Sequence, residues 1–157
     1  MAEDNTNNEK TSKKEAGAKA TGAARAKKAK PPAVEDKPFA EFVEQAFFPA
    51  LVTALDKVGL EGIELNFQKS QLAVKGASPS EDYWQVNGHW PTGSDRQFNI
   101  VFTKEDIKGP KFFYCTQGDI PSSTVEHFMG DERRITLDLM VLYTLQRLNG
   151  QKWLTRN

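Results

Sequence analysis

Apolar residues recur at helical spacing over residues 36–58, and this pattern predicts an amphipathic N-terminal helix. The apolar stripe consists of Phe39, Phe42, Val43, Ala46, Phe47, Ala50, Ala54 and Val58. Asp36 is the expected N-cap, Pro38 suits the first turn, and Gly59 is a natural end. Pro49 is expected to kink the helix, because it has no backbone N–H. The opposite side carries Phe48, Val52 and Leu55. Either the tail or a loop covers these three residues, or they face a partner.

Strict alternation of apolar and polar residues then predicts β-strands with one buried face. Residues 63–68 and 71–75 alternate in this way, and Lys69-Ser70 between them predicts a two-residue turn. Further strands are expected over residues 84–90, 97–102 and 111–116. Short connections between such strands favour an antiparallel meander of about five strands.

The C-terminal part of the chain is expected to return to helix. Ser123-Thr124-Val125-Glu126 predicts a capping box at the start of a short helix. Residues 135–148 predict a long final helix whose apolar side chains spread nearly all the way round. That helix must be buried on more than one side, with Trp153 and Leu154 folded back over it. The predicted fold class is α+β, with the N-terminal and C-terminal helices packed on one face of the sheet.

Charge divides the chain into two parts. The 157 residues carry 21 basic and 21 acidic side chains, so the formal net charge is zero. Residues 1–37 hold nine basic and six acidic residues and no aromatic residue, whereas residues 38–157 hold 12 basic and 15 acidic residues. We therefore predict a disordered Lys/Ala-rich tail over residues 1–36 and one domain over residues 37–157. The tail is either an electrostatic tether for an anionic surface or a solubilising segment.

The sequence contains no pattern that predicts catalysis, a cofactor or a metal site. The glycine-rich fingerprints of dinucleotide and phosphate binding do not occur. Cys115 is the single cysteine and alternates with aromatic residues, which favours a buried structural thiol over a nucleophile. Of the two histidines, His127 is expected to be a surface or capping residue. His89 faces the amide side of the predicted sheet near Tyr83 and Asp95, but no third group fixes a catalytic geometry. No apolar run is long enough for a membrane span or a secretory signal, which predicts a protein of the cytoplasm or of a membrane's cytoplasmic face.

Two sets of polar residues are candidates for a partner interface. Arg133 and Arg134 precede the final helix and can form bidentate pairs with a partner's carboxylates, although a solvated turn is the alternative. The polar face of the predicted sheet is rich in amides and includes Gln85, His89, Gln97 and Asn99. Such a face suits hydrogen bonding to a partner, and a solvated sheet face is again the alternative.

Several short segments carry a family resemblance. They are Lys37-Pro38-Phe39, Arg96-Gln97-Phe98-Asn99, Glu105-Asp106-Ile107-Lys108-Gly109, Asp131-Glu132-Arg133 with Thr136-Leu137-Asp138-Leu139, and Gln146-Arg147-Leu148-Asn149-Gly150-Gln151-Lys152-Trp153-Leu154. Together they resemble the family of subunit V (NdhV) of the cyanobacterial and chloroplast photosynthetic NAD(P)H dehydrogenase-like complex I. The resemblance covers about residues 37–157, and the C-terminal run is its most specific part.

The resemblance implies a non-catalytic, cofactor-free peripheral subunit on the cytoplasmic or stromal face of the thylakoid membrane, held there through the complex only. Such a subunit lies on the hydrophilic arm near the ferredoxin-docking subunit S and supports cyclic electron flow around photosystem I. If so, Gln151, Lys152 and Trp153 join the interface candidates. Ferredoxin is a further candidate partner, because ferredoxins are acidic and the basic tail would assist their encounter.

Two other functions compete with this reading. A small-molecule-binding domain would enclose a pocket lined by Trp84, Trp90 and Phe98. A nucleic-acid binder would act through the basic tail. The folded part argues against nucleic acid, because it is acidic and has no basic groove interleaved with aromatic residues.

Overall fold

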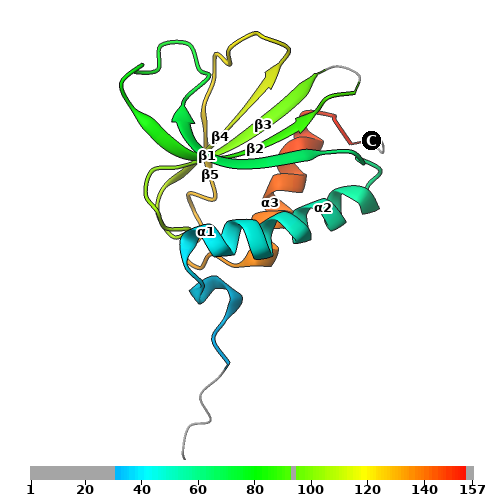
Figure 1. Cartoon of the computed structure of the whole chain (residues 1–157). Coiled ribbons are helices and arrows are strands. Elements are labelled where there is room, and N and C mark those ends of the chain that lie inside the picture. Colours follow the sequence, from blue (N-terminus) through cyan, green and yellow to red (C-terminus); the bar gives the residue numbers. More distant parts are fainter. Residues whose placement is uncertain (1–30, 93–94, 155–157) are drawn as a thin grey trace, which may run out of the picture. The chain divides into compact units, whose positions relative to one another are not determined.

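Five antiparallel strands form one sheet in the order in which they occur along the chain (Figure 1). The computed structural model describes residues 31–92 and 95–154, so most of the predicted tail lies outside the described residues. The strands are β1 (Glu64–Gln71), β2 (Asp82–Trp90), β3 (Arg96–Phe102), β4 (Lys111–Gln117) and β5 (Glu126–Phe128). The α+β class and the antiparallel meander are thereby confirmed.

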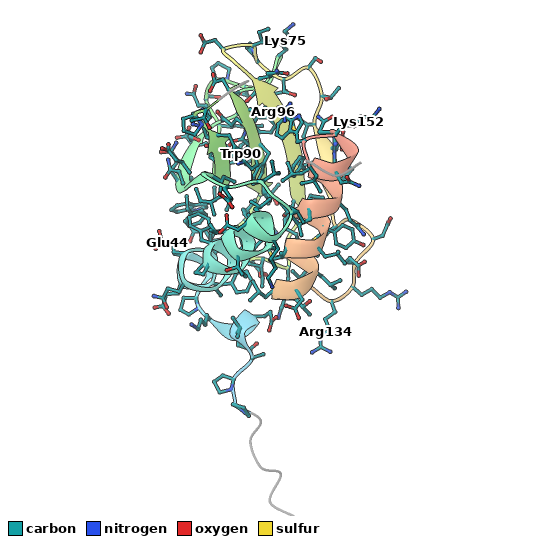
Figure 2. The ribbon with its side chains drawn as sticks, turned by 90° about the vertical axis from the view of Figure 1, so that its right-hand side faces the viewer. Glu44, Lys75, Trp90, Arg96, Arg134 and Lys152 are labelled. Atoms are coloured by element: carbon teal, nitrogen blue, oxygen red, sulfur yellow. The ribbon has the colours of Figure 1, made fainter. Side chains whose placement is uncertain are left out.

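Helical segments precede and follow the sheet. They are η1 (Val34–Asp36), α1 (Phe39–Glu41), η2 (Phe42–Phe47), α2 (Phe48–Lys57) and α3 (Leu137–Gly150). The Phe39 ring lies 5.1 Å from the Phe102 ring, and the Arg147 guanidinium lies 5.5 Å from the Phe113 ring. Ile100 is opposite Phe113 in the β3–β4 register, so Phe102 and Phe113 share one face of the sheet. The N-terminal helix, through Phe39 of α1, and the C-terminal helix α3, through Arg147, therefore both contact this face of the sheet. Helix α2 also contacts α3 (Figures 1 and 2).

The first helix contains a wide π turn over η2, which changes the buried face from the one predicted. The Phe48 N–H donates to the Val43 carbonyl, five residues back, and Pro49 follows in the first turn of α2. Each extra residue in a turn rotates the following side chains by about 100°. Leu51 and Leu55 are fully buried as a result. The prediction that Leu55 lies opposite the core was wrong.

The start of the first helix also differs from the prediction. Pro38 is the N-cap of α1, and it provides no side-chain hydrogen bond. Asp36 instead ends η1, and its carboxylate accepts a hydrogen bond from the Ala33 N–H at 3.1 Å. The N-cap assignment of Asp36 was therefore wrong, because Asp36 is the last residue of η1, a separate 3-10 turn that precedes α1.

The predicted hairpin at Lys69-Ser70 does not form. Both residues lie inside β1, which pairs with β2 along its whole length, so that Phe67 is opposite Val86. Residues 72–81 form the connection. Val74 in this connection makes a parallel bridge with Ser122, from the connection between β4 and β5. The Ala73 N–H of the first connection also donates to the Tyr114 hydroxyl at 3.3 Å, and Tyr114 lies on the opposite face of β4 from Phe113. The connections therefore meet over the face of the sheet away from Phe113.

The predicted capping box at Ser123–Glu126 is also absent, and Glu126 begins β5 instead. Pairing of Phe128 with Lys111 of β4 outweighs the local helix signal there. The final helix forms as predicted, with Thr136 as its N-cap, whose hydroxyl accepts a hydrogen bond from the Leu139 N–H at 3.2 Å. No helix within the described ranges is both long and apolar enough to cross a membrane.

Candidate functional site

Arg133 and Arg134 lie on an exposed turn at the N-terminal end of α3. Neither has a hydrogen bond or an ion pair with any residue that the structure describes. They line a groove of about 430 Å³ together with Lys108, which comes from the connection between β3 and β4. Arg134 extends away from the fold (Figure 2). Sequence reasoning missed Lys108 as a site residue, because it is distant in the chain from Arg133 and Arg134 and only the fold brings it to the same groove.

Acidic side chains also line this groove, but each is engaged by a neutral donor. The Glu132 carboxylate accepts a hydrogen bond from the Tyr143 hydroxyl, which raises the pKa of Tyr143. Glu35 accepts from the Leu137 N–H at 2.9 Å. Asp36 accepts from the Ala33 N–H. These bonds fix the positions of the three carboxylates but leave their charges in place, so the groove carries both signs. Its three cationic side chains (Lys108, Arg133 and Arg134) form no ion pair within the described residues and can pair with carboxylates of a partner.

Glu35 is expected to make folding sensitive to acid. Its hydrogen bond from the Leu137 N–H lowers the pKa of Glu35 below the ordinary value of a glutamate, and the charge of Arg134 lowers it further. A carboxyl group with a lowered folded-state pKa stabilises the fold above its unfolded pKa, and this contribution disappears as pH falls through the folded value. The Glu35→Gln variant should therefore lose less Tm than wild type between about pH 5 and pH 3. Thermal unfolding followed by circular dichroism measures this.

The matched control for this experiment is Glu44→Gln, at an exposed glutamate of η2. That variant should follow the wild-type pH dependence. Equal flattening of the curve in both variants would show that acid sensitivity is a general charge effect and that the Glu35–Leu137 hydrogen bond has no special part in it.

Two residues of the predicted amide face are not exposed. Gln85 is 2% exposed; its amide donates to the carbonyls of Ser70 and Gln71 at 2.8 and 3.0 Å. Its carbonyl oxygen accepts from the Tyr114 hydroxyl at 2.8 Å. Asn99 is also 2% exposed. The expectation that these side chains are exposed was wrong. Gln85 is covered by the end of β1 and by Tyr114, whose hydroxyl also accepts from the Ala73 N–H at 3.3 Å, and Asn99 accepts a hydrogen bond from Asn87 at 2.7 Å.

The other two residues of that face remain reachable. His89 is half-buried, and its Nε2 lies 2.5 Å from an Asp95 carboxylate oxygen. Gln97 is half-buried and donates to the Asn99 side-chain oxygen at 3.4 Å. A partner contact at either residue stays a prediction.

The C-terminal candidates are positioned by the end of α3. The Lys152 N–H donates to Asn149 O at 2.8 Å, and the Trp153 N–H donates to Leu148 O at 3.2 Å. This pair of bonds is a Schellman motif, in which Lys152 has a left-handed φ of 57°. The motif turns Trp153 back onto the sheet, where its ring lies 6.0 Å from that of Trp90. Gln151 and Lys152 stay exposed beside it.

The candidate residues therefore lie in separate places. Arg134 and Lys152 are at opposite ends of α3 (Figure 2), which is about 21 Å long. One flat partner surface would need to cover the whole helix to contact both ends. The alternative aromatic pocket is likewise divided: Trp84 and Trp90 are six residues apart on β2, or about 20 Å, and Phe98 is fully buried in the core.

A comparison with protein families places the chain. Residues 33–155 match the family model described as "Protein of unknown function (DUF2996)". The chain belongs to this family. The match to DUF2996 includes every helix and strand described above. No curated protein matches the chain.

In this DUF2996 member, the individual reactive side chains have structural partners. Burial raises the pKa of the Cys115 thiol, which keeps it protonated and weakly nucleophilic. Lys111 is 3% exposed; its ammonium donates to the Ile107 carbonyl at 2.6 Å and so closes the turn before β4. Within the described ranges, no group of three or more His, Cys, Asp or Glu side chains could hold a metal ion. The open cations are thus the most distinctive chemistry of this surface.

Proposed function

We propose that this chain is a non-catalytic peripheral subunit of the photosynthetic NAD(P)H dehydrogenase-like complex I. In this role it lies on the cytoplasmic face of the thylakoid membrane and stabilises the hydrophilic arm near the ferredoxin-docking subunit S. It thereby supports ferredoxin-dependent cyclic electron flow around photosystem I. Redox centres belong to its neighbours in the complex.

The observation that carries the proposal is the set of three cationic side chains at the N-terminal end of α3. Arg133, Arg134 and Lys108 are exposed and form no ion pair with any residue that the structure describes, and the charge of Arg134 acts on Glu35 only at longer range. Arginine is favoured where a protein recognises carboxylates, because its planar group forms two parallel hydrogen bonds. This surface is suited to an acidic patch on a neighbouring subunit. The resemblance of the run Gln146–Leu154 supplies the identity of the complex.

Charge reversal at the two arginines is expected to disrupt assembly. The tagged full chain with Arg133→Glu and Arg134→Glu should recover complex I subunits from cyanobacterial membranes at least about tenfold less well than wild type, because attraction becomes repulsion. Quantitative mass spectrometry of the purified fraction measures this. Circular dichroism of the isolated variant should match wild type, since both side chains lie in solvent.

The matched control reverses two exposed lysines elsewhere, Lys69→Glu and Lys75→Glu, with the same change in net charge. This variant should assemble as wild type does. Recovery of no complex I subunits by the wild-type chain would refute the proposed function. Equal losses in both double variants would show that total charge, and no particular surface, governs assembly.

A further inference from the structure

A second groove lies at the other end of α3, where β2, β3 and the C-terminal turn meet. Its walls are Trp90, Arg96 and Trp153, together with Thr92 and the segment 59–61 after α2, and its volume is about 400 Å³. Trp90 and Arg96 are opposite each other in the β2–β3 register. Figure 2 shows Trp90, Arg96 and Lys152 at this end of the molecule, away from Arg134.

Two buried N–H groups at this groove have no acceptor. Trp90 is 7% exposed, and its Nε1–H is buried without a hydrogen-bond partner in the described part of the chain. The same is true of the Arg96 Nε–H. By contrast, the Trp84 Nε1–H donates to the Glu105 carboxylate at 2.9 Å. Buried donors without acceptors are unfavourable, so two of them at one groove indicate a site for acceptor oxygens.

The charge of Arg96 is also without a carboxylate among the described residues. The Asp95 carboxylate, next in the chain, lies 2.5 Å from His89 Nε2. Glu61 lines the groove but forms no ion pair with Arg96. The Arg96 guanidinium instead lies 5.6 Å from the centre of the Trp153 ring. A guanidinium whose face lies over an aromatic ring can still bind an anion through the N–H groups at the guanidinium edge.

We propose that this groove binds an aspartate or glutamate side chain of a partner protein, whose carboxylate accepts hydrogen bonds from Arg96 and Trp90. Arg96 and Trp153 are half-buried, and they shift to admit the carboxylate to the covered donors. The exposed Gln151 and Lys152 continue the surface beside the groove.

A protein partner suits this site because tryptophan and arginine in partly buried pockets are the residues that most often anchor protein interfaces. The proposal rests on the proposed function, since it adds a second anchor to the same subunit. The groove and the Arg133–Arg134 surface would then hold the partner at both ends of α3.

The test follows the indole N–H signals of the full ¹⁵N-labelled chain by NMR. The probes are a blocked pentapeptide with one central glutamate, the same peptide with glutamine, and sodium acetate, all at constant ionic strength. The Trp90 signal should move and saturate with the glutamate peptide, with a Kd on the order of 1 mM. The Trp84 signal is the internal control, because its N–H is already bonded to Glu105.

Variants locate the binding site. Arg96→Gln should weaken binding of the glutamate peptide at least tenfold. Lys75→Gln, which also removes one positive charge but at an exposed position outside both grooves, should leave binding unchanged. Glu61→Gln should tighten binding several-fold, because it removes a like charge from the groove wall. If Arg96→Gln fails to fold, the glutamine peptide on wild type and the Glu61→Gln variant decide the question.

Several results would overturn the inference: a Trp90 signal that does not move, equal binding of the glutamine peptide, or equal weakening by Lys75→Gln. Acetate that binds as tightly as the glutamate peptide would assign the groove to free small carboxylates and so refute a protein anchor. The two proposals can fail separately. Peptide binding without recovery of complex I subunits would refute the proposed function alone, and recovery without peptide binding would refute the groove alone.

Discussion

Leu55→Ala is expected to lower the free energy of unfolding by about 3 kcal/mol. Leu55 is fully buried in α2 and belongs to the core shared by helices and sheet. Truncation removes buried methyl groups and leaves a cavity that the surrounding side chains fill only in part. Urea unfolding followed by fluorescence measures the change, with an m value equal to that of wild type.

The control is Leu142→Ala in α3, the same chemical change at a side chain that is 47% exposed. This variant should stay within about 0.5 kcal/mol of wild type. The comparison tests the wide turn of η2, because a regular helix would place Leu55 opposite the core. Comparable losses of stability in the two variants would contradict the rotated face.

The first helix shows what a sequence pattern can and cannot predict. Its extent and its amphipathic character follow from spacing and from the Gly59 end. Its buried face does not, because the switch from a four-residue to a five-residue hydrogen bond before Pro49 depends on packing against the sheet. If a constant helical period is assumed, the predicted buried face is correct before such a turn and rotated after it. For this reason the prediction placed Phe42 in the core correctly but placed Leu55 on the wrong side.

The sheet shows a similar division between local and distant information. Alternation predicted the meander, but local turn propensity placed a hairpin inside β1. The pairing of Phe67 with Val86, and the bridge from Val74 to Ser122, join residues far apart in the chain. Burial of Gln85 accompanies its hydrogen bonds to Ser70, Gln71 and Tyr114, so the sequence could indicate an amide-rich face but not which of its amides are covered.

The candidate surfaces were predicted in the same uneven way. Arg133 and Arg134 stand in a charged run, and a charged run is exposed by default. Their neighbour Lys108 and the internal bond of Glu132 to Tyr143 depend on the fold. The Trp90–Arg96 groove could not be predicted at all, because no residue type signals a donor that lacks an acceptor.

Gly88→Ala is expected to destabilise the fold by about 3 kcal/mol. Gly88 lies in β2 opposite Phe98 of β3. A Cβ atom at this position would be 2.2 Å from Phe98 Cε1 and 3.0 Å from Ile63 Cδ1. Phe98 is fully buried and stacks on Phe113 with ring centres 5.7 Å apart, so the ring has little room to move. Chemical denaturation measures the loss.

The control is Gly150→Ala at the end of α3, where the added Cβ meets nothing closer than 3.7 Å. Alanine is the better helix former, so this variant should be as stable as wild type or slightly more stable.

The cause of the Gly88 effect is tested by adding Phe98→Leu to Gly88→Ala. If the ring and the new methyl group compete for one space, the double variant loses less stability than the sum of the single variants. A strictly additive double variant would mean that Gly88 is required for its backbone and not for the ring that covers it.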